Sequence, residues 1–381
     1  MTTSICTFAN LAIAAVQHLG LHKSISSEPS QVPSASEAFH ADNRAPRTGE
    51  EQRAVLGCFL LTSSYVSIIS DLHSRQCEFT LLRSFSSSIK IIDSLRWTPH
   101  MEECLRDLDS RREHVLDQSL VQQVRLQLVA ERATLMRAYE NVMEPRTTLR
   151  PSPVLYAQAL LSHLDEIRTS TIPVLHQCAP IQLHAYAAQL SINEVALSGD
   201  PAVKDKAGTG PTPPNLSRLK HLHASLHAIK SWLEVFFSLP LASFVGLPTC
   251  HIFQFRHCMG MLFVLSTLED ASWNAADVRA DLDILAVVDR VSERFRQIAR
   301  EGGIDANGEA QGEDLWTRAA ERLQGLKHLW AGKLTPQPPV PPVSAYTATA
   351  TPGTDTNGAL FANWSDLDFS NFDWVNSSFL S

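Results

Sequence analysis

Apolar residues recur every three to four positions through most of this chain, and each recurring segment ends near proline, glycine or an acidic cluster. This spacing gathers apolar side chains on one face of a helix. It predicts helices at residues 8–19, from Glu50 to about 65, at 99–108, from Asp117 to before Pro145, and at 153–170, 179–198, 214–238, 248–270, 277–301 and 312–331. No segment alternates convincingly with the period of two expected for a half-buried strand. The predicted fold is therefore all-α, an irregular multi-helix bundle or array, because no repeat of fixed length supports a regular solenoid.

Local residues sharpen some of these boundaries. Gly20 follows the first apolar stripe, where a glycine commonly ends a helix. Glu50 and Glu51 place negative charge at the positive end of the second helix dipole. Thr98 and Pro99 form a typical helix start, with a capping side chain followed by proline at the first helical position. Residues 66–92 show no sustained period, and their structure is not predicted.

Low-complexity stretches divide the chain. Residues 24–49 and 199–214 are polar and rich in proline, serine or glycine, which is typical of exposed, disordered connections. Residues 334–358 are a Pro/Thr/Ala tract that cannot bury enough apolar surface to fold. We therefore predict a helical regulatory domain at 1–333, a disordered linker at 334–358 and a separate segment at 359–381.

Charge and cysteine usage exclude several classes of protein. The net charge is -8, and the arginines at 290, 294, 296 and 300 alternate with acidic residues, which predicts a solvated helix face and no autonomous DNA binding. No apolar run reaches the roughly 20 residues needed to cross a bilayer, so no membrane association is expected. The seven cysteines show no disulfide spacing, which favours a reducing compartment and buried thiols.

The sequence contains no recognisable enzyme motif. The chain has no phosphate-binding glycine loop at a helix start, no nucleophile elbow and no zinc-protease motif. His223 and His227, with His221 nearby, could present two metal ligands on one helix face, but no carboxylate or cysteine completes a site. Cys250, His251, His257 and Cys258 lie in an apolar run that is typical of a core. We predict no catalytic, cofactor-binding or metal-ligating residue, and an enzyme or small-molecule-binding protein remains a further alternative.

The C-terminal segment combines bulky apolar residues with carboxylates, and no Lys or Arg follows Lys333. Repulsion between carboxylates keeps aromatic side chains solvated and available to a partner groove, as in acidic activation segments. We predict that the segment binds transcription coactivators, with the aromatic residues as anchors; the alternative is that it docks onto its own helical body. The predicted partner-binding residues are Asp366, Leu367, Asp368, Phe369, Phe372, Asp373 and Trp374.

Blocks of the first 135 residues resemble the middle region of fungal zinc binuclear cluster transcription factors. The blocks are LAIAAVQHLGLHK, EEQRAVLGCFLLTSS, LRWTPHMEECLRDLD and LVQQVRLQLVAERA, in this order. The most characteristic positions are Phe59, Trp97, Pro99 and Glu103. The resemblance implies a nuclear regulator with an N-terminal zinc cluster, a helical regulatory domain and a C-terminal activating segment.

Two departures from this family are evident. The seven cysteines are dispersed between positions 6 and 258, so the zinc cluster is missing, and zinc is expected only if a cluster lies upstream of Met1. Residues 66–85 look inserted. A misplaced start codon and a retained intron in the gene model are possible causes, which sequencing of the transcript would separate from a true property of the protein.

Together these features predict a fungal transcriptional regulator that controls, as one hypothesis, a gene cluster for secondary metabolism. The alternative is a modulator without a zinc cluster that forms dimers with intact zinc-cluster factors and titrates them; homodimers are also compatible with the sequence. Either protein would act in the nucleus.

Overall fold

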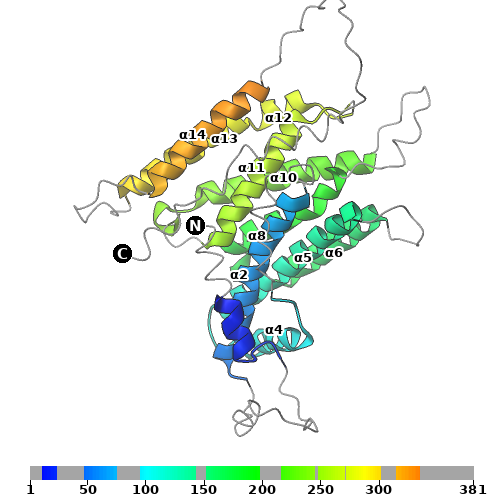
Figure 1. The fold of residues 1–381 in the computed structure, drawn as a ribbon, viewed down its shortest axis with the longest axis vertical. Helices are drawn as coiled ribbons and strands as arrows, with labels where there is room; N and C mark the ends of the chain where they lie inside the picture. Colours follow the sequence, from blue (N-terminus) through cyan, green and yellow to red (C-terminus); the bar gives the residue numbers. More distant parts are fainter. Residues whose placement is uncertain are drawn as a thin grey trace, which may run out of the picture.

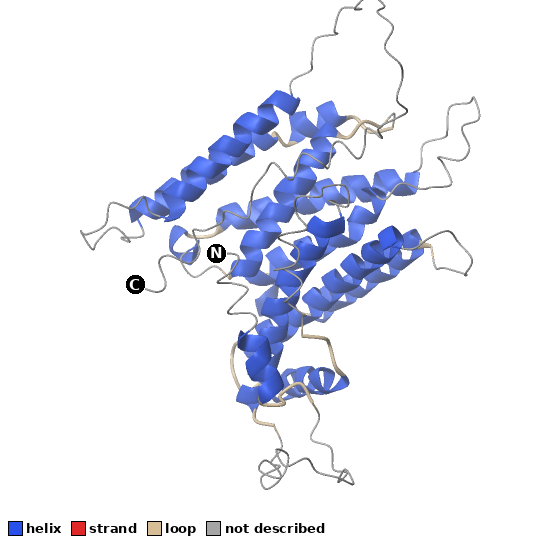
Figure 2. Ribbon diagram, in the orientation of Figure 1, coloured by secondary structure: helices blue, strands red, loops and turns tan. Residues whose placement is uncertain are grey.

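The computed structural model describes residues 11–23, 47–74, 95–142, 152–197, 216–244, 248–270, 272–301 and 315–334. Within these ranges the regular structure is helical, with one isolated strand-type bridge between Asp270 and Trp273 (Figures 1 and 2). Residues 11–18 are helical, followed by α2 (Gly49–Ser74), α4 (Pro99–Arg111), α5 (Asp117–Val142), α6 (Pro153–Ser170), α7 (Pro173–His176), α8 (Ala179–Asn193), η2 (Glu194–Leu197), α10 (Leu216–Ser238), η3 (Leu241–Phe244), α11 (Thr249–Thr267), α12 (Ala275–Asp281), α13 (Ile284–Glu301) and α14 (Leu315–Leu334). The all-α prediction is confirmed.

The first helices begin and end with specific capping arrangements. Gly20 has a φ of 64°, and the amide of Leu21 donates to the carbonyl of Val16, which closes the first helix as a Schellman motif. Thr48 and Glu51 each accept a hydrogen bond from the other's amide, a capping box that starts α2. Thr98 accepts from the amide of Met101 at the start of α4.

Two helices differ from the sequence prediction. The α2 helix runs to Ser74, so residues 66–74, for which no structure was predicted, are helical. The single helix predicted at 277–301 is wrong, because the chain breaks at Leu282 and Asp283 between α12 and α13. The Asp283 carboxylate accepts a hydrogen bond from the amide of Leu285, so it caps a new helix instead of continuing the old one.

Three buried apolar clusters hold the helices together. One joins residues 11–21 to α2, α4 and α5, and a second joins α5, α6 and α8. The third and largest joins α8, α10, α11, α12, α13 and α14, and contains stacked rings such as Trp232 on Phe236 at 5.0 Å. Because α5 and α8 each contribute to two clusters, the cores are linked through these two helices.

The α13 and α14 helices pack side by side as a hairpin at one end of the array (Figure 1). The buried face of α14 carries Trp316, Ala320, Leu323 and Trp330. Trp316 contacts the ring of Phe295, with centroids 5.2 Å apart. The opposite face of α14 is exposed.

Candidate functional site

Three of the four family-like positions are structural. Phe59 is fully buried, and its ring lies 4.8 Å from that of Trp97. The indole nitrogen of Trp97 donates to Glu102 at 3.2 Å, and Pro99 occupies the first turn of α4. Glu103 is 58% exposed and pairs with His100 across one turn. Phe59, Trp97 and Pro99 therefore fix how α4 packs on α2, whereas Glu103 faces solvent.

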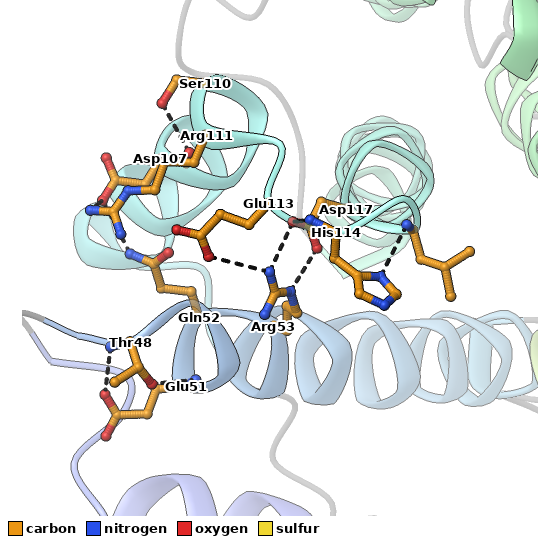
Figure 3. Close-up of polar contacts among 11 residues, drawn as sticks. Thr48, Glu51, Gln52, Arg53, Asp107, Ser110, Arg111, Glu113, His114 and Asp117 are labelled. Carbon is orange, nitrogen blue, oxygen red and sulfur yellow. Dashed lines mark hydrogen bonds and ion pairs between the residues drawn. The ribbon is translucent and has the colours of Figure 1, made fainter.

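A polar clamp formed by Arg53, Glu113 and Asp117 joins the start of α5 to α2 (Figure 3). Arg53 donates from Nε and Nη2 to the two carboxylate oxygens of Asp117, at 2.6 and 3.0 Å, and Glu113 lies 3.6 Å from the same guanidinium. The Arg53 hydrogen bond is the largest cause that lowers the pKa of Asp117, which is almost fully buried. Beside it, Gln52 donates to Asp107 at 3.1 Å. The clamp therefore orients the start of α5 on α2.

A chain of hydrogen bonds crosses the interior between α2, α5 and α8. The buried His184 imidazole donates from Nε2 to the amide oxygen of Gln127 at 2.9 Å. The Gln127 amide nitrogen donates to Ser63 Oγ at 2.8 Å, and Ser63 donates to the Glu131 carboxylate. Burial lowers the pKa of His184 to about 3, with a smaller contribution from nearby His251. A neutral imidazole this deeply buried cannot exchange protons with a substrate near neutral pH. We therefore interpret the chain as structural.

Two more buried histidines act in the same way. His251 donates from Nδ1 to Gln254 at 2.9 Å, and His221 donates from Nδ1 to the Asn193 amide oxygen at 2.7 Å. Burial lowers the pKa of both imidazoles. The His221 hydrogen bond joins α10 to α8, whereas the His251 hydrogen bond lies within α11.

An ion triad joins three further elements. The Glu194 side chain, at the start of η2, is 1% exposed and pairs with Arg137 from α5 and with His257 from α11. Buried carboxylates are costly unless they are paired in this way. The triad therefore holds η2 against α5 and α11. Neither Glu194 nor Arg137 stood out in the sequence, because the two are far apart along the chain and each resembles a surface residue.

Of the two histidines considered as a metal site, His227 is exposed and His223 contacts an aromatic ring. The His223 ring packs on Trp273, with centroids 4.9 Å apart. No group of three or more metal-ligating side chains comes together in the described ranges. Cys250 and Cys258 are buried, as predicted for the run that contains them, and burial raises the pKa of both thiols, to about 12 for Cys250. Their thiolate forms, which react and bind metals, are therefore suppressed.

The prediction of a solvated face for the arginines of α13 is wrong for Arg294, which is half-buried. Arg290 lies over the ring of Phe237 at 3.8 Å, and Arg294 donates to the carbonyl of Leu239. Arg290 is nevertheless exposed, and Arg296 and Arg300 pair with Glu293 on the surface, so these three arginines fit the prediction. The guanidinium groups of Arg290 and Arg294 attach the hairpin to the end of α10.

The predicted partner-binding residues fall outside the described residues, namely Asp366, Leu367, Asp368, Phe369, Phe372, Asp373 and Trp374. The same holds for residues 199–214 and 334–358, apart from Leu334, and for most of 24–49. None of the helices in the described ranges is long and apolar enough to cross a membrane.

Comparisons with known proteins show similarity to fungal proteins that are named transcription factors. A family model named ATEG07667_C and described as a C-terminal domain matches residues 241–381. The chain is 29% identical over 372 residues to the protein named transcription factor opdL of Penicillium oxalicum, and 33% identical over 247 residues to a protein named transcription factor of Aspergillus terreus. These alignments cover 96% and 62% of this chain. No solved structure matches.

The chain spans 60% and 41% of the length of these two relatives, respectively. The alignment with the Penicillium oxalicum protein nevertheless includes almost the whole helical body and continues into the C-terminal segment, given its coverage of this chain. The chain is thus a homologue of fungal proteins named transcription factors.

Proposed function

We propose that this chain regulates transcription in a fungal nucleus through its helical body and an activating C-terminal segment. The observation that carries the proposal is the similarity to a protein named a transcription factor over 96% of this chain. The acidic-aromatic pattern of residues 359–381 supplies the proposed mechanism, and control of a gene cluster for secondary metabolism is part of the same proposal.

The internal polar groups support a regulatory role over a catalytic one. His184, His221 and His251 are buried and engaged in hydrogen bonds between helices or within a helix, and burial lowers the pKa of each. Buried thiols with raised pKa values are poor nucleophiles. These side chains stabilise a scaffold, whose role we propose is to present surfaces to partner proteins.

The activating segment is tested by fusing residues 334–381 to an unrelated DNA-binding domain and measuring a reporter gene. We expect activation at least about tenfold above the domain alone, and loss of most of it when Phe369, Phe372 and Trp374 become Ala, because aromatic anchors dominate such contacts. A matched control changes Asn363, Ser370 and Asn376 to Ala in the same segment and should retain activation. A silent fusion, or equal activity of both triple variants, contradicts the proposed role.

A further inference from the structure

Two buried histidines where α8 meets α11 each have one ring nitrogen without a hydrogen-bond partner. These atoms are Nδ1 of His184 and Nε2 of His251, and no described residue pairs with either of them. The two residues are 1% and 0% exposed. The α11 helix, which carries His251, packs against α8 and α2 (Figure 1), and His251 affects the pKa of His184, so the two imidazoles are neighbours. Buried polar atoms without a partner are rare in folded proteins, and a bound ligand is one explanation for them.

The tautomer of His184 follows from the far end of its hydrogen-bond chain. A carboxylate can only accept, so the Ser63 hydroxyl donates its hydrogen to Glu131. The oxygen of Ser63 then accepts from the amide nitrogen of Gln127 at 2.8 Å, which turns the amide oxygen of Gln127 toward His184. His184 therefore carries its hydrogen on Nε2, and its Nδ1 keeps a lone pair.

The tautomer of His251 is fixed in the same way. The indole N–H of Trp232 can only donate, and it points at Gln254 Oε1, with the two heavy atoms 3.4 Å apart. The same oxygen accepts from Nδ1 of His251 at 2.9 Å, so Nε2 of His251 keeps a lone pair. Burial lowers the pKa of both imidazoles, which keeps them neutral near neutral pH. Two lone pairs thus remain to which no described residue donates a hydrogen.

This arrangement matches the way proteins prepare histidines to bind a metal ion. A metal-binding imidazole almost always donates its other ring N–H to an oriented acceptor, as both histidines do to a glutamine oxygen. Structural zinc takes four ligands, and the described ranges bring no three metal-ligating side chains together. Two neutral imidazole nitrogens suit Cu(I) better, because this ion is stable with two ligands in a linear arrangement. Its single charge also costs less to bury than the double charge of zinc.

We propose that Nδ1 of His184 and Nε2 of His251 together bind one Cu(I) ion between α8 and α11. Binding releases no proton, because both nitrogens already carry lone pairs, and the copper remains Cu(I), so neither an oxidant nor a reductant is needed. The ion would link α8, which is shared by two cores, to α11, and it would stabilise the folded state by mass action. The site does not depend on the proposed function, since its tests measure metal binding and stability.

The test titrates the full chain with Cu(I), in the absence of oxygen and against a coloured Cu(I) chelator. Thiolates compete for this soft ion, so accessible thiols such as Cys58 and Cys178 are first alkylated in the folded chain. We expect uptake of one Cu(I) per chain, slowly, because the site opens only through local unfolding. X-ray absorption should show a linear ion with two nitrogen ligands and no sulfur. The temperature of unfolding should rise with the concentration of Cu(I).

Two variants remove a ligand atom and keep the neighbouring hydrogen bond. In His184→Gln an amide N–H replaces the Nε2–H that donates to Gln127, and in His251→Asn an amide N–H replaces the Nδ1–H that donates to Gln254. Each should lower the affinity for Cu(I) by more than about 100-fold, because loss of a supporting residue alone costs about 10- to 100-fold. The exposed His163 supplies the control, and His163→Gln should leave the affinity unchanged. Circular dichroism confirms that each variant is folded.

Several outcomes overturn the inference. They are the absence of Cu(I) uptake by the unaltered chain, ligation by sulfur only, and binding that survives in both ligand variants. Zinc binding that is equally tight and equally dependent on the two histidines shows that the choice of metal is wrong. If a ligand variant does not fold, Gln254→Leu keeps both ligand atoms and removes the acceptor that orients His251, so it should lower the affinity about 10- to 100-fold. An unchanged affinity in that variant contradicts the proposed arrangement.

Discussion

At the scale of single residues, polar side chains in the interior stabilise this protein only in particular protonation states. The His184 side chain is buried and donates to Gln127, and its pKa is lowered to about 3. In the unfolded chain the same imidazole has a pKa near 6.5. Folding therefore requires the neutral form over the range between these two values.

This difference predicts acid sensitivity. A histidine whose pKa is depressed in the folded state binds more protons when unfolded, so stability falls as the pH drops below about 6.5 and levels off near the folded value. His184 alone should lower the free energy of unfolding by about 1 kcal/mol between pH 7.5 and 5.5. Urea unfolding of the wild type and of His184→Gln at both pH values measures this, and the variant should lose that part of the pH dependence even if it is less stable overall.

The exposed His163 provides the control, since its side chain is 45% exposed. His163→Gln tests the effect of the substitution itself at a surface position, and its free energy of unfolding is measured at the same two pH values. An equal effect at His163 and His184 would show that the acid sensitivity does not come from burial of the His184 imidazole.

At the scale of helices, we expect Gly→Ala substitutions to change the free energy of unfolding in opposite directions, because the backbone conformation of the glycines differs. Gly57 in α2 and Gly325 in α14 have helical backbones, and a Cβ at either would meet no atom of the described residues within 4 Å. Changing either to Ala should raise the free energy of unfolding by about 0.5 to 1 kcal/mol, because alanine is the better helix former. Gly20 has a φ of 64°, so Gly20→Ala should lower it by about 1 kcal/mol. Thermal or urea unfolding of the three variants compares the signs directly, and a loss of stability at Gly57 or Gly325 would contradict this account.

The helices also show what local sequence can predict. The starts of α4, α5 and α6 agree with the predictions because their signals, such as Thr98 with Pro99, act within a few residues. The break between α12 and α13 was missed, because Leu282 and Asp283 interrupt the helix while the apolar period continues across them. The run of α2 beyond residue 65 was missed because its β-branched residues obscure the period of the apolar positions, whereas a helix that has already begun extends through residues of weak propensity.

At the scale of the whole molecule, α8 links two cores. Leu190 belongs to the large cluster with α10 and α11, and Ile192 to the cluster with α5 and α6, and both are fully buried. Leu190→Ala and Ile192→Ala should each destabilise the whole helical body by about 2 to 5 kcal/mol in one cooperative transition. Circular dichroism and tryptophan fluorescence should then report the same midpoint. Two separate transitions, only one of which shifts in each variant, would show that the cores unfold independently.

By itself the sequence determined the class of fold, most helix boundaries and the chemical character of the C-terminal segment, because periodicity, capping and charge are local properties. Short blocks of residues also indicated a resemblance to fungal transcription factors. Only the tertiary structure decided that Phe59 and Trp97 pack together, that Glu194 lies between Arg137 and His257, and that one face of α14 remains exposed. These features depend on which helices meet, and residues far apart in the chain carry no local signal of their contact.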